Sequence, residues 1–258
     1  MCKDSAWAAR LRALTGAQEI EAYRAIDSTN ARAKAWARAG AAQGALVIAA
    51  GQTAGRGRLG RTFASPADAG LYMTVILWPD GAALERLTIA AAVATCEAIE
   101  ACTPYRPGIK WVNDLLLGEK KICGILAEAV TSPSGARGAV VGIGVNLAEG
   151  ALPEELRGIA GALGGVERDA LAGRIYQNLL RDALNPSEAL LEEYRARSIL
   201  LGREIDYCEK GVWRHARAEG IGAKVRGASH AIGFFAGAHC PNRGKPSPQR
   251  RRLCALAI

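Results

Sequence analysis

Histidine is scarce in this sequence: three occur among 258 residues, and none comes before His215. This absence excludes a Ser-His-Asp triad, a histidine metal site or a histidine-activated Cys123 from the part of the chain that precedes His215. Apolar runs are also short, since none approaches the ~18 to 20 continuous apolar residues of a membrane helix. The seven cysteines have no C-x-x-C spacing, which is typical of a reduced compartment. We therefore expect a cytoplasmic protein that neither crosses a membrane nor builds a metal site from its own side chains.

Acidic residues are missing from the end of the chain. The formal net charge is +8, but residues 221–258 contain seven Lys or Arg and no Asp or Glu, whereas residues 1–220 contain 26 basic and 25 acidic residues. The basicity therefore belongs to the tail, and the body is close to neutral. A basic tail alone indicates at most salt-sensitive, sequence-indifferent contact with nucleic acid, and we expect no specific DNA binding.

The glycine-rich stretch 55–60 matches the dinucleotide pattern G-x-G-x-x-G, yet its surroundings do not fit that interpretation. The Rossmann fingerprint needs a helix that begins within the glycines. Here a strand over 45–50 does precede them, but residues 62–70 contain Pro66 and have no helical period. Arginines stand at positions 56 and 58 within the stretch and at position 61 directly after it. Such permanent, bidentate charges favour a mobile loop that closes around phosphate or carboxylate groups.

The apolar pattern predicts an α+β fold with a mixed, largely antiparallel sheet flanked by helices. Strands are expected over 45–50, 70–77, 109–114, 115–117, 121–130 and 138–147. Helices are expected over 5–14, 83–101, 168–184 and 187–197, and from just after Ser28-Thr29-Asn30 to about 40. Successive hairpins in place of alternating βαβ units are a second argument against a Rossmann domain. We expect a main domain over 1–200 and a small β-barrel-like domain over 201–258, atypical from about 221.

Five short segments carry polar and charged residues in a fixed order along the main domain. They are Ser28-Thr29-Asn30, the run from Gln52 to Arg61, Lys110-Trp111-Val112-Asn113-Asp114, the run from Lys121 to Glu128, and Gly142-Ile143-Gly144-Val145-Asn146. Their order and spacing closely resemble the catalytic domain of the biotin–protein ligases over residues 20–210. The resemblance implies a class II synthetase-like fold for the main domain.

This resemblance implies a two-step reaction. Members of the family activate the carboxylate of biotin with ATP to give biotinyl-5′-adenylate, and then pass the biotinyl group to a lysine of a biotin carboxyl carrier domain, such as that of acetyl-CoA carboxylase. Bringing a carboxylate to a phosphate joins two anions, whose repulsion Arg56, Arg58 and Lys121 would neutralise. Mg²⁺ is expected because the phosphates of ATP need a hard cation. A homodimer is possible by the same resemblance.

The resemblance also assigns the site residues. The catalytic residues would be Arg56, Arg58, Lys121 and Asp114. The biotin-binding residues would be Ser28, Thr29, Asn30, Gln52, Gly55, Arg56, Gly57, Lys121 and Gly124. The ATP or adenylate site would contain Arg58, Arg61, Phe63, Lys110, Trp111, Asn113 and Asn146. Uncharged hydroxyl and amide groups suit biotin, because its ureido group presents two N–H donors and one carbonyl acceptor.

Several of these residues also have a purely structural interpretation. Ser28 or Thr29 can cap the helix that follows, Trp111 can be a core aromatic, and Asp114 is a natural turn residue. Lys121 can be a solvated hairpin lysine.

The sequence departs from the family pattern in three places. Val112 stands where the family usually has proline, and Phe63 stands where some members have a tryptophan that packs on adenine. Residues 203–219 look like the start of the family's small β-barrel, but 221–258 do not continue it. We interpret that end as frameshifted or diverged, which an intact mass and sequencing of the 3′ end of the gene would settle.

Three other functions stay open at this stage. A lipoate or octanoate protein ligase has a related fold, although lipoate has no ureido group for Ser28, Thr29 and Gln52 to bind. A biotin-responsive DNA-binding regulator needs a module that the short segment ahead of Ile20 cannot house. The third alternative is a catalytically weak protein, in which the main domain folds correctly but the unusual end destabilises it.

Overall fold

The computed structural model describes residues 2–209, 212–222 and 233–236. Its centre is a seven-stranded sheet with the order β1-β2-β3-β7-β6-β5-β4. The strands are β1 (Ile20–Tyr23), β2 (Leu46–Ala49), β3 (Gly70–Leu77), β4 (Gly108–Lys110), β5 (Asp114–Leu117), β6 (Lys120–Thr131) and β7 (Arg137–Asn146). Only the β1–β2 pair is parallel, and the other pairs in this sheet are antiparallel. The expected mixed, largely antiparallel sheet is confirmed.

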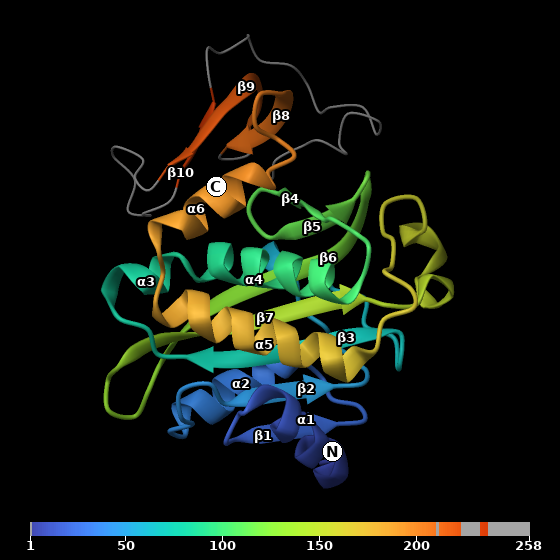
Figure 1. The fold of residues 1–258 in the computed structure, drawn as a ribbon, viewed down its shortest axis with the longest axis vertical. Coiled ribbons are helices and arrows are strands. Elements are labelled where there is room, and N and C mark those ends of the chain that lie inside the picture. The colour runs from blue at the N-terminus through green and yellow to red at the C-terminus, as the bar shows by residue number, and fades with distance from the viewer. Residues whose placement is uncertain (1, 210–211, 223–232, 237–258) are drawn as a thin grey trace.

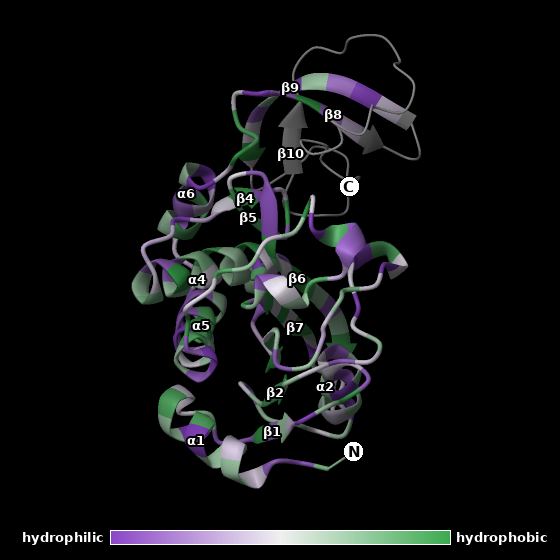
Figure 2. Cartoon of the chain, turned by 90° about the vertical axis from the view of Figure 1, so that its right-hand side faces the viewer, coloured by the Kyte–Doolittle hydropathy of each residue, from purple (hydrophilic) through white to green (hydrophobic). Residues whose placement is uncertain are grey.

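Helices cover both faces of the sheet (Figure 1). They are α1 (Ser5–Thr15), α2 (Thr29–Arg38), α3 (Gly81–Glu85), α4 (Leu87–Cys102), α5 (Arg168–Leu184) and α6 (Glu188–Ala196). Figure 2 shows α1, α4 and α5 on one side of the sheet and α2 on the other. The helix expected over 83–101 is divided, because the chain turns at Arg86 between α3 and α4.

Alternation of side chains along the strands produces two cores. Leu46 and Ile48 of β2 pack with α1, α4 and α5, whereas Val47 and Ala49 pack with α2. This is the period-2 pattern of a strand buried on both faces. The two cores fix the register of the sheet, since a slip by one residue would exchange every side chain between them.

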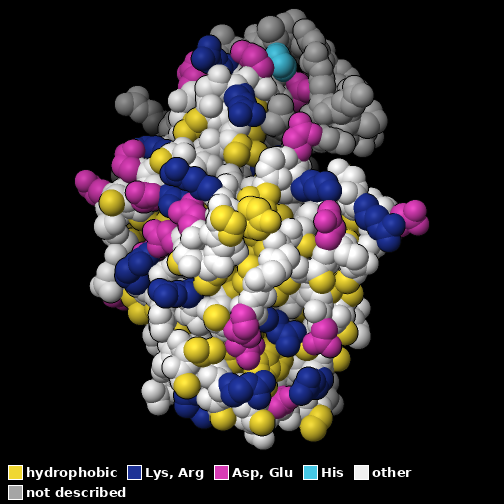
Figure 3. Space-filling view, turned by 45° about the vertical axis from the view of Figure 1, so that its right-hand side comes forward, with side chains coloured by type: hydrophobic (Ala, Val, Ile, Leu, Met, Phe, Trp, Pro, Cys, Tyr) yellow, Lys and Arg dark blue, Asp and Glu magenta, His cyan; other side chains and the backbone are white. Residues whose placement is uncertain are grey.

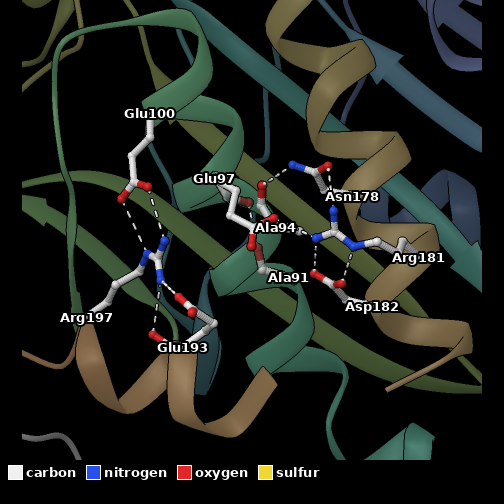
Figure 4. Close-up of polar contacts among 10 residues, drawn as sticks. Ala91, Ala94, Glu97, Glu100, Asn178, Arg181, Asp182, Glu193 and Arg197 are labelled. Carbon is white, nitrogen blue, oxygen red and sulfur yellow. Dashed lines mark hydrogen bonds and ion pairs between the residues drawn. The ribbon is translucent and has the colours of Figure 1, made fainter. Parts of the chain in front are cut away.

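Ion pairs lock α5 and α6 against α4 (Figure 4). The guanidinium of Arg197, just after α6, contacts both carboxylate oxygens of Glu100 and the carboxylate of Glu193. Arg181 of α5 donates to Glu97 of α4 at 2.6 Å. The side chain of Arg197 is only 8% exposed, so its pairing avoids the free-energy cost of an unpaired buried charge.

The C-terminal part that is described forms a separate three-stranded antiparallel sheet of β8 (Glu204–Glu209), β9 (Val212–Gly222) and β10 (Gly233–Ala236). Residues 203–219, expected to begin a small β-barrel, therefore do fall in strands, β8 and β9. The hypothesis of an abnormal end falls mainly on 223–232 and 237–258, which lie outside the described residues. Among the described helices, none combines the length and apolar character needed to span a membrane.

Candidate active site

A cavity opens on the face of the sheet that carries α2. Its floor is the middle of β6 and β7. Its walls are the start of α2, the loop 55–61 (the arginine loop) and the turn between β4 and β5. The lining includes five basic side chains, from Arg56, Arg58, Arg61, Lys110 and Lys121, and one acidic side chain, from Asp114. On the outer surface drawn in Figure 3, by contrast, Lys and Arg are interspersed with Asp and Glu among the described atoms. The excess of positive charge in the cavity makes it suited to an anion.

Uncharged polar groups gather where α2 begins. Ser28 is the N-cap of α2, and its side chain accepts a hydrogen bond from Ala31 N. The backbone N and the hydroxyl of Thr29 donate to Gln52 Oε1 at 2.8 and 3.0 Å. Gln52 Nε2 in turn donates to Ser65 Oγ at 2.8 Å. The cap interpretation of Ser28 is therefore confirmed, and the cap also presents Thr29 and Gln52 to the cavity.

The network continues through Thr74 of β3, which is fully buried. Its hydroxyl lies 2.9 Å from Thr29 Oγ1 and 2.8 Å from Asn30 Oδ1. Asn30 Nδ2 donates to Glu128 Oε2, and Glu128 also pairs with Lys34 at 2.9 Å. Burial of Glu128 disfavours its charge, but these two donors outweigh burial and lower the pKa of the carboxyl. The neutral end of the cavity is thus held by a continuous hydrogen-bonded chain.

The arginine loop touches the turn after β4 through one side chain. Arg58 Nη1 donates to Asn113 Oδ1 at 3.0 Å. Asn113 is itself fixed to β6, because its Nδ2 donates to Ile125 O and its carbonyl accepts from Ile125 N. The Trp111–Val112 peptide bond in this turn is cis.

Lys121 is fixed through both its side chain and its backbone. Its Nζ lies 2.7 Å from Asp114 Oδ1 on the neighbouring strand. Its backbone N donates to Ile159 O, and its carbonyl accepts from Gly161 N. This lysine, unlike the exposed Lys120, is held with its charge at the edge of the cavity.

Glycines provide the floor beneath Phe63. Gly124 of β6 pairs with Gly144 of β7, and a Cβ on Gly144 would come within 2.5 Å of the Phe63 ring. Phe63 also packs edge-on against Tyr72, with ring centroids 6.5 Å apart. Glycine in a strand interior marks close approach of another group; here that group is the Phe63 ring, whose stacking on adenine stays a prediction.

The structure brings together every site residue expected from the sequence except Gly55 and Asn146. Gly55 lies outside the lining. A Cβ there would come within 2.4 Å of Phe63 O, so glycine at this position allows the backbone at 55 to lie against the backbone at 63. Asn146 is buried, and its Nδ2 donates to Gly161 O at 2.9 Å, which ties β7 to the loop that holds Lys121. The binding roles assigned to the whole set stay predictions.

Sequence reasoning missed part of the lining. The missed residues are Leu59, Thr62, Tyr72, Met73, Ile125, Leu126, Gly142, Ile143 and Gly144. The two glycines had a readable signal, since glycine alternating with isoleucine inside a strand leaves one face without side chains. Thr74 lies outside this lining and had a weaker signal, as the one Ser or Thr in the apolar run 70–77.

Comparison with known proteins agrees with this geometry. Residues 22–146 match the model of the biotin/lipoate A/B protein ligase family. The "Bifunctional ligase/repressor BirA" of Bacillus spizizenii is 33% identical over 235 residues, covering 81% of this chain and 72% of that protein. The "Biotin--[acetyl-CoA-carboxylase] ligase" of Mycobacterium tuberculosis is 32% identical over 206 residues, covering 74% and 75%.

Solved structures point the same way. The biotin protein ligase from Aquifex aeolicus in complex with biotin and ATP superposes with a TM-score of 0.67 at 25% identity, covering 86% of this chain and 97% of that one. The fold and the site define a ligase that handles an acid and a nucleotide. The chain belongs to the biotin/lipoate A/B protein ligase family and, within it, to the biotin–protein ligases.

Proposed function

We propose that this protein activates biotin with ATP to give biotinyl-5′-AMP and pyrophosphate, and then transfers the biotinyl group to a lysine of a biotin carboxyl carrier domain. One observation carries the proposal: a single cavity joins a neutral polar end, built around Gln52 and Thr29, to a cationic end that contains Arg58 and Lys121. Biotin has the same polarity, with an uncharged ureido head and a carboxylate at the other end.

The neutral end fits the ureido group by hydrogen bonding without net charge. Gln52 and Thr29 are already oriented by their mutual hydrogen bonds, so less conformational entropy is lost when a ligand binds. Asn30 is fixed between Thr74 and Glu128. Lipoate has no ureido group, so it could not form the hydrogen bonds that this end would offer to biotin, and a site built to hydrogen-bond a ligand discriminates strongly against an analogue without those groups.

The cationic end fits the chemistry of adenylation. The carboxylate oxygen of biotin attacks the α-phosphorus of ATP, a new C–O–P linkage forms, and the bond to pyrophosphate breaks. Arg56, Arg58 and Lys121 would offset the negative charge that accumulates. In a site closed to water, each charge-assisted hydrogen bond contributes about 1.5–3 kcal/mol, and several together lower the barrier by several decades in rate.

A magnesium ion would enter with ATP. Among the described residues, no group of three or more His, Cys, Asp or Glu is arranged to hold a metal, and Asp114 is the acidic side chain in the lining. One carboxylate together with substrate phosphates is a usual environment for Mg²⁺. The ion would neutralise phosphate charge when bound, while Arg58, Lys121 and the backbone around Gly57 orient the reacting groups.

The second step needs a neutral amine from the carrier lysine to attack the acyl carbon, releasing AMP. Asp114 lies beside Lys121 at this end of the cavity and is the candidate to orient the incoming amine or accept its proton. The arginine loop carries Leu59, which is 71% exposed at its tip. We propose that the loop closes over the adenylate and protects the mixed anhydride from water until the carrier arrives.

Transfer to a carrier domain tests the whole proposal. The purified chain, a biotin carboxyl carrier domain, biotin, ATP and Mg²⁺ are incubated together, and the carrier is weighed by mass spectrometry. The proposal expects one biotinyl group on one lysine, and none when that lysine is replaced by arginine or when ATP is omitted. A carrier that accepts lipoate or octanoate but not biotin would instead favour the related acyl-protein ligase.

A further inference from the structure

Tyr194 of α6 is a fully buried tyrosine. It contacts the turn 111–113, two residues of which, Trp111 and Asn113, line the cavity. Its hydroxyl donates to Val112 O at 3.0 Å. Its ring packs edge-on against Trp111, with centroids 6.0 Å apart and planes at 90°. Burial raises the pKa of this hydroxyl well above its usual range, which favours the neutral form that donates the hydrogen bond.

Trp111 and Val112, which Tyr194 contacts, immediately precede the residue that binds the arginine loop. Val112 is followed by Asn113, whose Oδ1 accepts the hydrogen bond from Arg58 Nη1. Asn113 is anchored to Ile125 of β6. The turn 111–113 is therefore held from two sides, by the sheet through Asn113 and by α6 through Tyr194.

The helix that carries Tyr194 is well anchored. Arg197 pairs with Glu100 of α4 and with Glu193 (Figure 4). Arg195 Nε donates to Ile221 O of β9 at 2.8 Å. A side chain on such a helix can fix a neighbouring turn, because the helix itself has little freedom to follow the turn if it moves.

We propose that Tyr194 is a positioning residue for adenylation: it fixes the 111–113 turn so that Asn113 holds the guanidinium of Arg58 in the orientation used at the adenylate. This inference rests on the proposed function, in which Arg58 neutralises the adenylate. Tyr194 does not line the cavity and acts only through the turn. A small displacement of Arg58 would reduce the rate, because stabilisation of the transition state requires donors already in place.

A matched control separates positioning from ordinary packing. Tyr176 of α5 is also buried, and its hydroxyl donates to Gly44 O at 2.8 Å, away from the cavity. Both Tyr194→Phe and Tyr176→Phe remove one buried hydroxyl that serves a backbone carbonyl. Both variants are expected to lose similar thermal stability, but only the first should alter Arg58.

The first test needs no ligand and no activity. The side-chain N–H signal of Arg58 is recorded by NMR in the free protein and assigned by its loss in Arg58→Lys. The proposal expects this signal to shift and broaden in Tyr194→Phe and to stay unchanged in Tyr176→Phe. An unchanged Arg58 signal in Tyr194→Phe would overturn the inference, whether or not the protein proves to be a biotin ligase.

The second test is a double-mutant cycle in biotin-dependent ATP–pyrophosphate exchange. Tyr194→Phe should lower kcat/KM for ATP about three- to tenfold, corresponding to one hydrogen bond, with KM for biotin unchanged. In the Arg58→Ala background the same substitution should have no further effect, since its target is gone. If the two substitutions instead reduce kcat/KM by independent factors that multiply, the positioning role is overturned. If the wild-type chain shows no biotin-dependent exchange, the proposed function is refuted, and the NMR result still decides the inference about Tyr194.

Discussion

Lys121 Nζ and Asp114 Oδ1 form an ion pair of 2.7 Å between neighbouring strands at the edge of the cavity. The side chains are 35% and 26% exposed, so solvent screens the pair and its contribution to stability is small. In the proposed mechanism the pair is positional: Lys121 would stand beside the site of adenylation, and Asp114 would be the carboxylate available to the incoming amine.

Replacing Lys121 by glutamine should therefore impair catalysis without impairing the fold. We expect biotin-dependent ATP–pyrophosphate exchange to fall about ten- to a hundredfold, as for the loss of one charged donor, and the melting temperature to change little. Lys120→Gln is the control, because Lys120 is adjacent, exposed and paired with Glu149. Equal exchange rates in the two variants would remove Lys121 from the mechanism.

Arg58→Ala should slow formation of the adenylate and loosen its retention. The guanidinium is held by Asn113, so its removal takes away a preorganised charge, worth about one to two decades in rate. Release of biotinyl-AMP is measured by rapid gel filtration of the complex. The exposed Arg157→Ala serves as the control, and an Arg58→Ala protein that retains the adenylate as long as wild type would contradict the assignment.

Thr74→Val tests the buried network at the neutral end of the cavity. The substitution keeps the shape but removes the hydroxyl between Thr29 and Asn30. We expect a loss of about 1–3 kcal/mol in the free energy of unfolding and a rise of roughly tenfold in KM for biotin, because Asn30 and Thr29 lose their shared partner. Thr95 is equally buried but bonds within α4 to Ala91 O, so Thr95→Val should leave KM for biotin unchanged.

The lowered pKa of Glu21 predicts how the free energy of unfolding depends on pH. Burial disfavours the charge of this carboxylate, but hydrogen bonds from Arg32, Lys3 and Tyr23 outweigh burial and hold its pKa at about 2, below the ordinary 4.5. Because the pKa is lower in the folded state, the stabilisation is present above pH 4.5 and is lost as pH falls from 4.5 towards 2.

Glu21→Gln should remove this pH-dependent part, on the order of 3 kcal/mol at neutral pH. Urea unfolding at a series of pH values measures it, with the exposed Glu155→Gln as control. A wild-type stability that does not fall more steeply than that of Glu21→Gln between pH 4.5 and 2 would contradict the assignment.

The sequence predicted the strands of the central sheet from local signals, except β1, over which no strand was expected. Short, nearly continuous apolar runs such as 45–50 and 70–77 identify the buried strands, and Pro66 with the non-helical run after Gly60 excludes a phosphate-binding helix. The resemblance then assigned most of the polar lining of the cavity, including Gln52 and Lys121.

What the sequence did not predict depends on contacts between distant segments. Thr74 matters because it meets Thr29 and Asn30, which precede it by 45 and 44 positions in the sequence. Tyr194 reads as an ordinary apolar position of a helix until the structure places its hydroxyl on Val112. The division of the helix at Arg86 was also missed, since no proline or strong cap marks it.

ATP–pyrophosphate exchange by the purified chain, with biotin, lipoate or no acid added, tests the central claim most directly. The account predicts exchange that requires biotin, is absent with lipoate, and falls at least about tenfold in Arg58→Ala. Exchange supported by lipoate, or no biotin-dependent exchange from a folded sample, would contradict it.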